Sequence, residues 1–436
     1  MLTLIATCAQ MTHPEAGPSF GSPILRTADR PLRIAHVVNE PFGFESASGV
    51  QQVIHCLSTA QAELGHAVAV VSRDDNAVTF LGAGGESTSA AFGTVSARPE
   101  KSLRERLLSR YLEPALAEDV LAWQPDIVHF HSVHIPQNVV LAAHLCRAGI
   151  PYCVTVHGAL FRAALRRGWL KKTLFDRFFE RRYLNEARFI HALSPHEAEV
   201  VRRRGVNRPI VVVPNGLPPD TDVLPSRPDA LYAENPGLRD QRVFMFIGRL
   251  DPWQKGLDLL VEAFASAGLP DASLVLVGPD CRGSRRALAA RAERLGVSSR
   301  VVFIEAAFGQ ARADLFAAAD VFVHPSRWEG LSLSVLAAAA AGRACMLTRE
   351  ADPLGELERA HAAVVVDASV SSIVNGLRQA ATLSRQELHI MGTRARRVAE
   401  THFAWPSIAA KLVEAYRHAL APQESCGALE STPRVG

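Results

Sequence analysis

Around Glu329 the chain reads HPSRWEGLSLSVLAAAAAG, residues 324–342. The apolar run from Ala319 to Val323 predicts a strand just before this stretch, and the alanines predict a helix within it. Between the two lie a lone carboxylate, Glu329, and a glycine, Gly330, that frees the backbone. The first amides of a helix have no partner inside the helix and bind phosphate well. The stretch therefore predicts a site for a phosphorylated, hydroxyl-rich ligand.

Short apolar strands alternate with amphipathic helices along most of the chain, which is typical of parallel sheets covered on both faces. The pattern runs through 32–217, is interrupted by a polar, proline-rich linker at 218–241, and restarts at 242–403. We predict an α/β fold with two doubly wound, Rossmann-like domains facing a deep cleft at the carboxyl ends of their strands. The predicted strands are Arg33–Val38, Ala67–Ser72, Asp126–His131, Tyr152–Val156, Phe189–Ser194, Ile210–Val213, Val243–Ile247, Ser273–Val277, Val301–Ile304, Val321–Val323 and Ala344–Leu347.

The composition argues against a disordered chain, a nucleic-acid-binding protein and a disulfide-bonded protein. The 436 residues are 48% hydrophobic and 21% charged, which suits two folded domains. A net charge of +3 gives no reason to expect a nucleic-acid partner. The seven cysteines form no Cys-x-x-Cys pair, so we expect reduced thiols and a cytoplasmic protein. Residues 1–31 and 421–436 are predicted to be a flexible leader and tail.

A second candidate site follows the predicted strand Val243–Ile247, where residues 248–256 read GRLDPWQKG. Gly248 permits a tight turn, Arg249 can bind a diphosphate through two parallel hydrogen bonds, and Lys255 adds a point charge. A solvated basic loop is the alternative, but cations flanked by glycines at the end of a buried strand favour an anion site. Gly278-Pro279 ends the next strand and is either an ordinary turn or a wall facing the base or sugar.

Histidines gather at two further strand ends. His129 and His131 share one face of a strand, with His134 soon after, so chelation of a metal is possible. No cysteine or carboxylate of suitable spacing follows, so we predict no metal and expect His129 and His131 to face the cleft on the acceptor side. His157-Gly158 closes another buried strand, where His157 is either structural or functional.

Residues 161–182 interleave basic and apolar side chains in a helical pattern. A basic amphipathic helix can lie on an anionic membrane or contact an anionic acceptor. The alternative is a domain helix with a solvated basic face. On the first interpretation the protein is peripheral on the inner face of the plasma membrane. The basic residues are Arg162, Arg166, Arg167, Lys171, Lys172, Arg177, Arg181 and Arg182.

Together these motifs resemble those of the family 4 glycosyltransferases, which have the two-domain GT-B fold. The resemblance covers roughly Arg33 to Leu420. It implies a retaining enzyme that takes sugar from a nucleotide-diphosphate sugar, needs no metal or other cofactor, and ends in a helix, 404–420, that packs back on the first domain. The motifs, in the family's order, are Ser48-Gly49-Val50, Gly65-His66, Asp126–His131, His157-Gly158, Ser194, Pro214-Asn215-Gly216, Gly248-Arg249-Leu250, Lys255-Gly256, Pro325-Ser326, Glu329-Gly330 and Thr401–Trp405.

The resemblance also implies roles for individual residues. Arg249 and Lys255 would bind the donor diphosphate and stabilise the leaving group, Glu329 would contact the donor sugar, and His157 would lie beside the reacting sugar. The acceptor would be lipid-linked or an oligosaccharide, in polysaccharide or glycoconjugate biosynthesis. The expected donor-binding residues are Gly49, Gly248, Gly278, Pro279, Gly330, Leu331, Ser332, Leu333 and Ser334.

One position departs from the family pattern. The family has a second glutamate that holds the ribose hydroxyls, and here that position is Ala337. A hydrogen bond to a charged group contributes about 1.5–3 kcal/mol, so its loss predicts a donor affinity lower by about one to two decades. Ser334, one helical turn earlier, could restore one bond. The alternative function is a non-catalytic partner or regulator, and a further alternative is an epimerase or phosphorylase.

Overall fold

The structure, a computed structural model, describes residues 30–38, 49–72, 77–81, 93–95, 114–161, 169–218 and 229–421. Leu32–Gly436 form one compact unit, and both β-sheets belong to it. The predicted leader and tail lie almost entirely outside the described residues. The same holds for Ser48, Arg162, Arg166 and Arg167.

The first sheet is parallel over most of its width, as predicted, but one edge is antiparallel. Its strand order is β4-β3-β2-β1-β5-β6-β7-β8. β3 pairs antiparallel with β2 and with β4, and neither β3 nor β4 was predicted, because strand–helix alternation contains no signal for such an edge. The strands are β1 Arg33–Val38, β2 Ala67–Ser72, β3 Ala77–Leu81, β4 Gly93–Val95, β5 Ile127–His131, β6 Tyr152–Thr155, β7 Phe189–Ala192 and β8 Ile210–Val212.

The second sheet has six parallel strands in the order β11-β10-β9-β12-β13-β14. The order reverses between β9 and β12, and ligands of doubly wound sheets bind at such a reversal. The sequence analysis predicted all of these strands except β14. They are β9 Arg242–Ile247, β10 Ala272–Val277, β11 Val301–Ile304, β12 Val321–His324, β13 Ala344–Thr348 and β14 Ala363–Val366.

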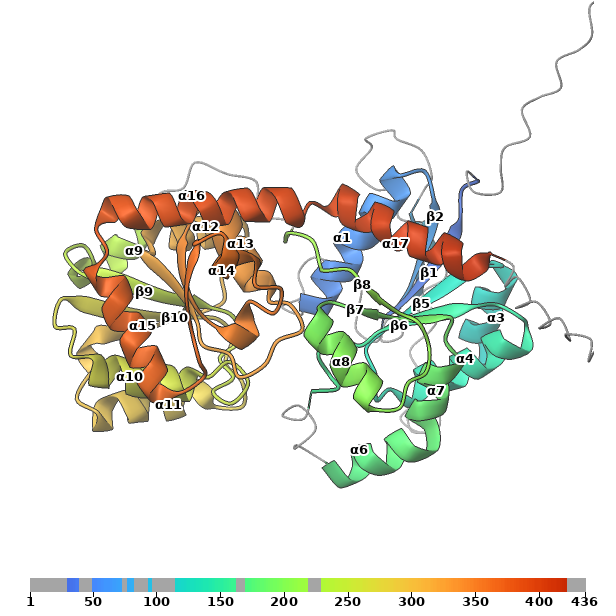
Figure 1. Cartoon of the computed structure of the whole chain (residues 1–436), viewed down its shortest axis with the longest axis horizontal. Helices are drawn as coiled ribbons and strands as arrows, with labels where there is room; N and C mark the ends of the chain where they lie inside the picture. The colour runs from blue at the N-terminus through green and yellow to red at the C-terminus, as the bar shows by residue number, and fades with distance from the viewer. Residues whose placement is uncertain are drawn as a thin grey trace, which may run out of the picture. The chain divides into compact units, whose positions relative to one another are not determined.

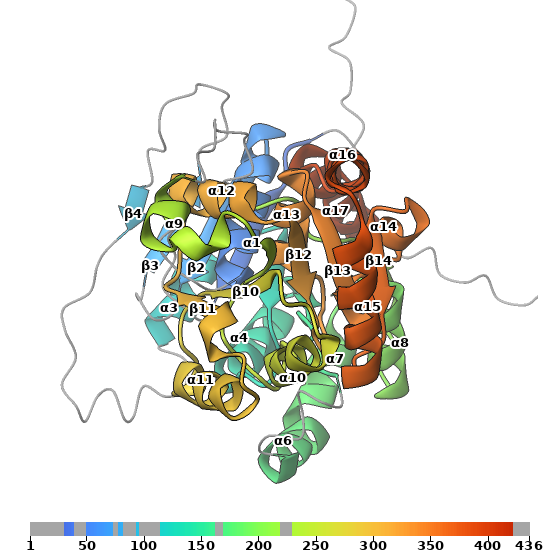
Figure 2. The same cartoon turned by 90° about the vertical axis from the view of Figure 1, so that its left-hand side faces the viewer.

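Alternate residues of the strands build separate cores on the two faces of the second sheet. Val243, Met245 and Ile247 of β9 pack with α12 Gly309–Ala318, α13 Leu333–Ala340 and α16 Arg385–His402. Phe244 and Phe246 point the other way, toward α10 Leu257–Ala267, α11 Ser284–Arg294 and α15 Val370–Thr382. Figure 2 shows the sheet between these two groups of helices. The period of two is what a strand buried on both faces requires.

The last helix, α17 Trp405–Leu420, packs on the first sheet. Ile408, Leu412 and Tyr416 share a core with residues of β1, β5 and β7 and with α1 Gly49–Glu63. Figure 1 shows α17 beside α1. The other face of this sheet is covered by α3 Pro114–Ala122, α4 Pro136–Arg147, α7 Arg181–Glu186 and α8 Pro195–Arg203.

The predicted linker is more structured than expected, and the basic segment is helical, as its pattern predicts. Within the proposed linker, residues 229–241 contain α9 Asp229–Glu234 and a 3₁₀ turn, Pro236–Leu238. Leu231 and Leu238 are buried in the core of the second sheet, so this part of 218–241 belongs to the second domain. The basic segment contains α6 Trp169–Phe175, followed by a π-helical turn, Asp176–Glu180, and α7. In the described part of the chain, no helix is both long and apolar enough to cross a membrane.

Candidate functional site

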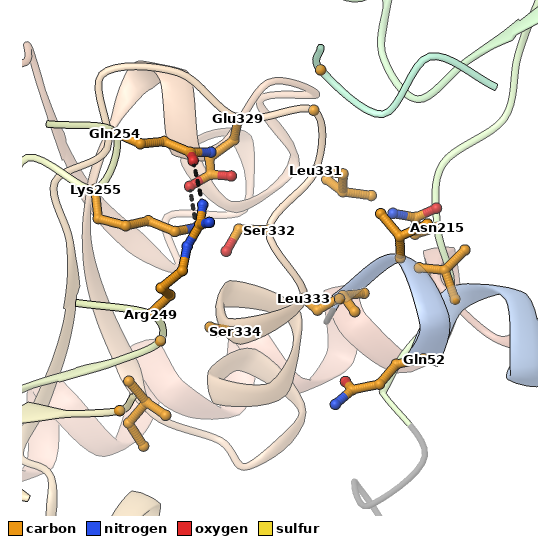
Figure 3. Close-up of a pocket in the computed structure, with 18 of the residues that line it drawn as sticks. Gln52, Asn215, Arg249, Gln254, Lys255, Glu329, Leu331, Ser332, Leu333 and Ser334 are labelled. Carbon is orange, nitrogen blue, oxygen red and sulfur yellow. Dashed lines mark hydrogen bonds and ion pairs between the residues drawn. The ribbon is translucent and has the colours of Figure 1, made fainter. Parts of the chain in front are cut away.

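A cavity of about 590 Å³ lies at the carboxyl ends of the central strands of the second sheet and is also lined by residues of the first domain. It brings together all the predicted residues except His129 and His131. Figure 3 labels Arg249, Lys255, Glu329, Leu331, Ser332, Leu333 and Ser334 among them. From the first domain come Gly49 and His157. From the second come Gly248, Arg249, Lys255, Gly278, Pro279, Glu329, Gly330, Leu331, Ser332, Leu333 and Ser334.

Lys255 and Glu329 form an ion pair in the wall of this cavity. Lys255 Nζ lies 2.6 Å from Glu329 Oε1, and both side chains are largely buried. Ser326 donates to the same oxygen at 2.6 Å, and His324 Nε2 lies 3.1 Å from it. None of these bonds uses Oε2, so this oxygen is left to accept a hydrogen bond from a ligand hydroxyl.

The surroundings of Glu329 keep it ionised. Burial acts to raise the pKa of its carboxyl, but the Lys255 ammonium and the His324 hydrogen bond outweigh burial and hold that pKa well below its usual range. Burial also lowers the pKa of His324, so this imidazole is neutral and donates through Nε2. The site therefore presents a fixed carboxylate next to a fixed cation.

Arg327 holds the loop that carries Lys255. Its guanidinium makes two hydrogen bonds of 2.8 Å to the carboxylate of Asp258 and donates to the carbonyl oxygens of Pro252 and Trp253. The same group lies 4.6 Å above the Trp253 ring. Arg327 had no predicted role, because its place between Pro325 and Glu329 does not show that it contacts a distant loop.

Glycines allow the loop after β9 to approach the loops after β10 and β12. Gly256 has φ 66°, and a Cβ there would overlap the carbonyl oxygen of Pro325. Gly278 has φ 144°, and a Cβ there would overlap the carbonyl oxygen of Gly248. Each position therefore needs glycine for both its backbone conformation and its space.

Arg249 supplies a second cation. Its Nη2 donates to Gln254 Oε1 at 2.8 Å, and its side chain is 54% exposed. The side chains of Arg249 and Lys255 converge near Glu329 (Figure 3). Another polar neighbour of Arg249 is the Asp251 carboxylate, whose Oδ2 lies 4.0 Å from Nη2. The exposed guanidinium can still bind an anionic ligand through its remaining N–H groups.

The N-terminus of α13 opens on the cavity. Its N-cap residue, Ser332, makes no side-chain capping bond, and Ser332 Oγ instead lies 3.1 Å from His324 Nε2. The first amides of α13 can therefore bind phosphate oxygens. Ser334 lines the cavity, whereas Ala337, one turn later, is buried in the core of the second sheet.

His157 reaches the cavity from a strained turn after β6. Its φ is 47°, and the next residue, Gly158, has φ 72°. The buried carboxylate of Glu197 accepts from the amides of Gly158 and Leu193, the latter at 2.6 Å. Burial raises the pKa of Glu197 to about 7. A Cβ on Gly158 would lie 3.1 Å from the Gly330 amide, so the turn directly adjoins the Glu329 loop.

The prediction that His129 and His131 face the cleft is wrong. Both are buried and do not line the cavity. They do share one face of β5, as their spacing predicts, with ring centroids 4.3 Å apart. The cover over that face is α17, whose Tyr416 hydroxyl lies 2.7 Å from His129 Nδ1. His134 lies elsewhere, with its amide donating to Glu180.

The sequence analysis missed His36, which completes a cluster with His129 and His131. One ring nitrogen from each lies within 4.8 Å of the others, a spacing that could hold a metal ion. However, both ring nitrogens of all three residues have hydrogen-bond partners within the protein. His36 would have been included if the sequence had shown that β1 pairs with β5, because His36 lies directly opposite His129 in that pairing.

Other cavity residues were not predicted. Gln52 lies near the start of α1, Gln254 precedes Lys255, and Asn215 belonged to a quoted motif without a role. Phe308 and Arg312 follow β11, whose carboxyl end adjoins that of β10. These two residues could have been found only from the strand order, which places β11 beside β10, and spacing along the sequence does not reveal that order.

Two family models match the chain. The model described as Glycosyltransferase Family 4 matches residues 47–221, and the model described as Glycosyl transferases group 1 matches residues 241–382. This chain belongs to family 4 of the glycosyltransferases.

Individual relatives agree with this family. The transferase is 29% identical over 314 residues to the D-inositol 3-phosphate glycosyltransferase of Nocardia farcinica, with 68% of this chain and 67% of the relative covered. It is 31% identical over 144 residues to the lipopolysaccharide glucosyltransferase WaaG of Escherichia coli, with 31% and 37% covered. The structure of Anabaena Alr3699/HepE in complex with UDP and glucose matches with a TM-score of 0.61 at 18% identity, over 89% and 100% of the chains.

The predicted family and the GT-B fold are therefore confirmed, and the transferase class of enzyme with them. The non-catalytic alternative rested on Ala337 alone, and these similarities do not favour it.

Proposed function

We propose that this transferase moves a glycosyl group from a nucleotide-diphosphate sugar to a lipid-linked or oligosaccharide acceptor, with retention of anomeric configuration, in polysaccharide or glycoconjugate biosynthesis. The observation that carries the proposal is the Lys255–Glu329 pair, which lines the cavity together with Arg249 and the N-terminal residues of α13. Cations and helix amides would bind the diphosphate, while Glu329 Oε2 would accept a sugar hydroxyl.

In the proposed reaction the bond between the anomeric carbon and the diphosphate oxygen breaks, and a bond to the acceptor oxygen forms on the same face. The acceptor proton passes to the departing diphosphate. Negative charge grows on that leaving group, and Lys255, Arg249 and the α13 amides, which line the cavity, would stabilise it. Such preorganised electrostatic groups commonly contribute most to catalysis.

The names of similar proteins support the class of substrate. WaaG is a lipopolysaccharide glucosyltransferase, the Nocardia relative is a D-inositol 3-phosphate glycosyltransferase, and HepE was solved with UDP and glucose. These names favour a UDP-linked sugar as donor and a glycolipid or phosphorylated polyol as acceptor.

The direct test is a screen of nucleotide sugars with oligosaccharide, lipid-linked and phosphorylated polyol acceptors. We expect acceptor-dependent release of a nucleoside diphosphate, and NMR should show the donor's anomeric configuration in the product. An inverted product would contradict retention. Nucleotide binding without turnover on any donor would contradict catalysis, and hydrolysis or isomerisation without an acceptor would indicate another reaction class.

We also propose that residues 161–182 contact an anionic membrane. Leu174, Phe178 and Phe179 are each at least half exposed, although such side chains are normally buried. Arg177 and Arg181 lie among them on the same segment. Apolar side chains flanked by arginines suit the interface of an anionic bilayer, where a lipid-linked acceptor would reside.

A further inference from the structure

Beneath the cavity, buried histidines of the first domain form one continuous hydrogen-bonded chain. It begins at His157, which lines the cavity, passes through Tyr416 of α17, and ends at the carbonyl oxygen of Val213. The proposed function uses only its first member. A polar chain of this length inside a core must have every group paired, so its proton positions can be worked out.

The carbonyl oxygen of Val213 determines the direction of the chain, because a carbonyl only accepts. His191 Nε2, 2.7 Å away, must carry the proton, which leaves His191 Nδ1 as an acceptor. Thr155 Oγ1, 2.7 Å from that Nδ1, donates to it and accepts from His129 Nε2 at 2.6 Å. His129 Nδ1 then accepts from the Tyr416 hydroxyl at 2.7 Å.

The same direction continues from Tyr416 to the cavity. The Tyr416 oxygen accepts from Gln61 Nε2 at 3.4 Å, and Gln61 Oε1 accepts from His36 Nε2 at 2.7 Å. His36 Nδ1 therefore accepts from His131 Nε2 at 3.0 Å. His131 Nδ1 in turn accepts from His157 Nε2 at 3.0 Å. The network thus assigns the Nε2–H tautomer to every histidine in the chain.

The assignment requires neutral imidazoles, and burial provides them. Burial lowers the pKa of His36 and of His191 to about 4. Burial and neighbouring histidines lower the pKa of His129 and of His131 well below the usual range. Near pH 7 none of these rings carries a charge, so each has one donor and one acceptor.

We propose that this chain makes His157 a hydrogen-bond acceptor toward the cavity, so that its Nδ1 receives a hydroxyl of the bound sugar, and that Tyr416 is the positioning residue that imposes this role. The identity of the ligand as a sugar rests on the proposed function; the tautomer does not. The two nitrogens of an imidazole point in different directions, and Nε2 is committed to His131. A lone pair at Nδ1 attracts a hydroxyl proton and repels a phosphate oxygen.

A metal held by His36, His129 and His131 is the competing explanation of the cluster. A metal would need a lone pair from each residue, and the lone pairs of these rings already accept from His131, Tyr416 and His157. Binding would break the chain in several places. The hydrogen-bonded chain accounts for all six nitrogens without an ion.

The first test is the tautomer itself, read by long-range ¹H–¹⁵N NMR of protein labelled with ¹⁵N-histidine. The His157→Gln variant identifies the His157 signals by their loss. We expect the neutral Nε2–H form in the wild type. In Tyr416→Phe the Gln61 amide can rotate, because its partner is gone, and we expect Nδ1–H to appear at His157. An Nδ1–H or doubly protonated His157 in the wild type would overturn the proposal, as would stoichiometric metal in the purified protein.

The second test separates the sugar from the nucleotide. We expect Tyr416→Phe to weaken binding of the nucleotide sugar by roughly two- to tenfold, the effect of one neutral hydrogen bond. Binding of the nucleoside diphosphate alone should not change. Tyr152→Phe is the matched control. This variant also removes a buried hydroxyl from the first domain, but that hydroxyl donates to the Tyr183 carbonyl oxygen and takes no part in the histidine chain.

The two tests have distinguishable failures. If Tyr416→Phe weakens both ligands equally, or if Tyr152→Phe has the same effect, the role of Tyr416 is only structural and the proposal fails. If no nucleotide sugar binds the wild type, the proposed function fails, while the NMR result still decides the tautomer of His157.

Discussion

Lys255 Nζ lies 2.6 Å from Glu329 Oε1, although 74 residues separate the two along the chain. The contact exists because β9 and β12 are neighbours at the point where the strand order reverses. The loop after each strand therefore ends at the same place. A cation from one loop and a carboxylate from the other therefore lie side by side in the wall of the cavity.

Replacing Lys255 by alanine should impair both activity and stability. Removal of a preorganised charge from a leaving-group site typically lowers kcat by about 10²–10³. Breaking a buried pair leaves Glu329 uncompensated, at a cost of about 3 kcal/mol, and thermal unfolding would report it. Lys411→Ala, on the exposed face of α17, is the control and should change neither quantity. Full activity of Lys255→Ala would remove this pair from the mechanism.

Gly256 and Gly268 offer a matched comparison at the two ends of α10. Their φ angles are 66° and 65°, so alanine strains both backbones alike, by about 1 kcal/mol. Only at Gly256 would the new Cβ overlap the Pro325 carbonyl oxygen. We therefore expect Gly256→Ala to lose more stability, and to lose donor binding by displacing Lys255, whereas Gly268→Ala keeps donor binding. Equal donor affinities in calorimetry would argue against this.

Ala337→Glu should strengthen binding of the nucleotide. Ala337 is itself buried, but it lies one turn after Ser334, which lines the cavity, so we expect the longer glutamate side chain to extend toward the cavity and to restore the family pattern. A charged hydrogen bond contributes about 1.5–3 kcal/mol, which is about one to two decades in affinity. Ala337→Gln keeps the shape without the charge and should gain less. If Ala337→Glu binds no better in calorimetry, the chain holds the ribose in another way.

Thermal stability should be greatest near pH 6.5. His36 and His191 have native pKa values of about 4, so between pH 6.5 and 4 their imidazoles take up protons in the unfolded chain but not in the folded one. The folded state therefore loses stability as the pH falls from 6.5 toward 4. Glu197 and Glu180 have native pKa values of about 7 and about 8, raised by burial. Their stabilisation is complete below 4.5 and is lost as the pH rises through these values.

Scanning calorimetry from pH 4.5 to 8.5 measures both slopes. Between 4.5 and 6.5 the shifted histidines outnumber the two glutamates, so the rising slope should prevail. Glu180→Gln should flatten the decline above pH 6.5, while Glu414→Gln, on the exposed face of α17, should not. A wild-type midpoint that keeps rising up to pH 8.5 would be inconsistent with these pKa shifts.

Vesicle flotation tests the membrane proposal. The transferase should float with anionic vesicles but not with neutral ones, and replacing Leu174, Phe178 and Phe179 by serine should abolish flotation. Ile390→Ser, at another exposed apolar side chain on α16, is the control. Charge reversal at Arg166, Arg167, Lys171 and Lys172 should also release the protein. Unchanged flotation of both variants would place the membrane contact elsewhere or exclude it.

Much of the fold could be predicted because buried parallel strands have a strong local signal. Runs such as Val243–Ile247 are apolar throughout, and the residues just after them therefore fall at one edge of the sheet. That geometry is why Arg249, Lys255 and Glu329 were found together around one cavity. β3 and β4 were missed, because they pair antiparallel at an edge outside the strand–helix alternation.

What could not be predicted depends on distant parts of the chain. His129 and His131 were placed correctly on one face of a strand, but nothing near them shows that Tyr416 covers that face. Leu231 and Leu238 lie in sequence that is typical of a linker, yet both pack into the second domain. Spacing shows which residues share a face, whereas the fold decides whether that face meets a ligand or another helix.

Calorimetric titration of the folded transferase with UDP, GDP, ADP and their sugar derivatives shows whether the cavity around Lys255 and Glu329 binds a nucleotide sugar. We predict that at least one binds at a single site with micromolar affinity, and that Lys255→Ala loses this binding while Lys411→Ala retains it. If none of these nucleotides binds the folded wild-type protein, the cavity around Lys255 and Glu329 is not a nucleotide-sugar site.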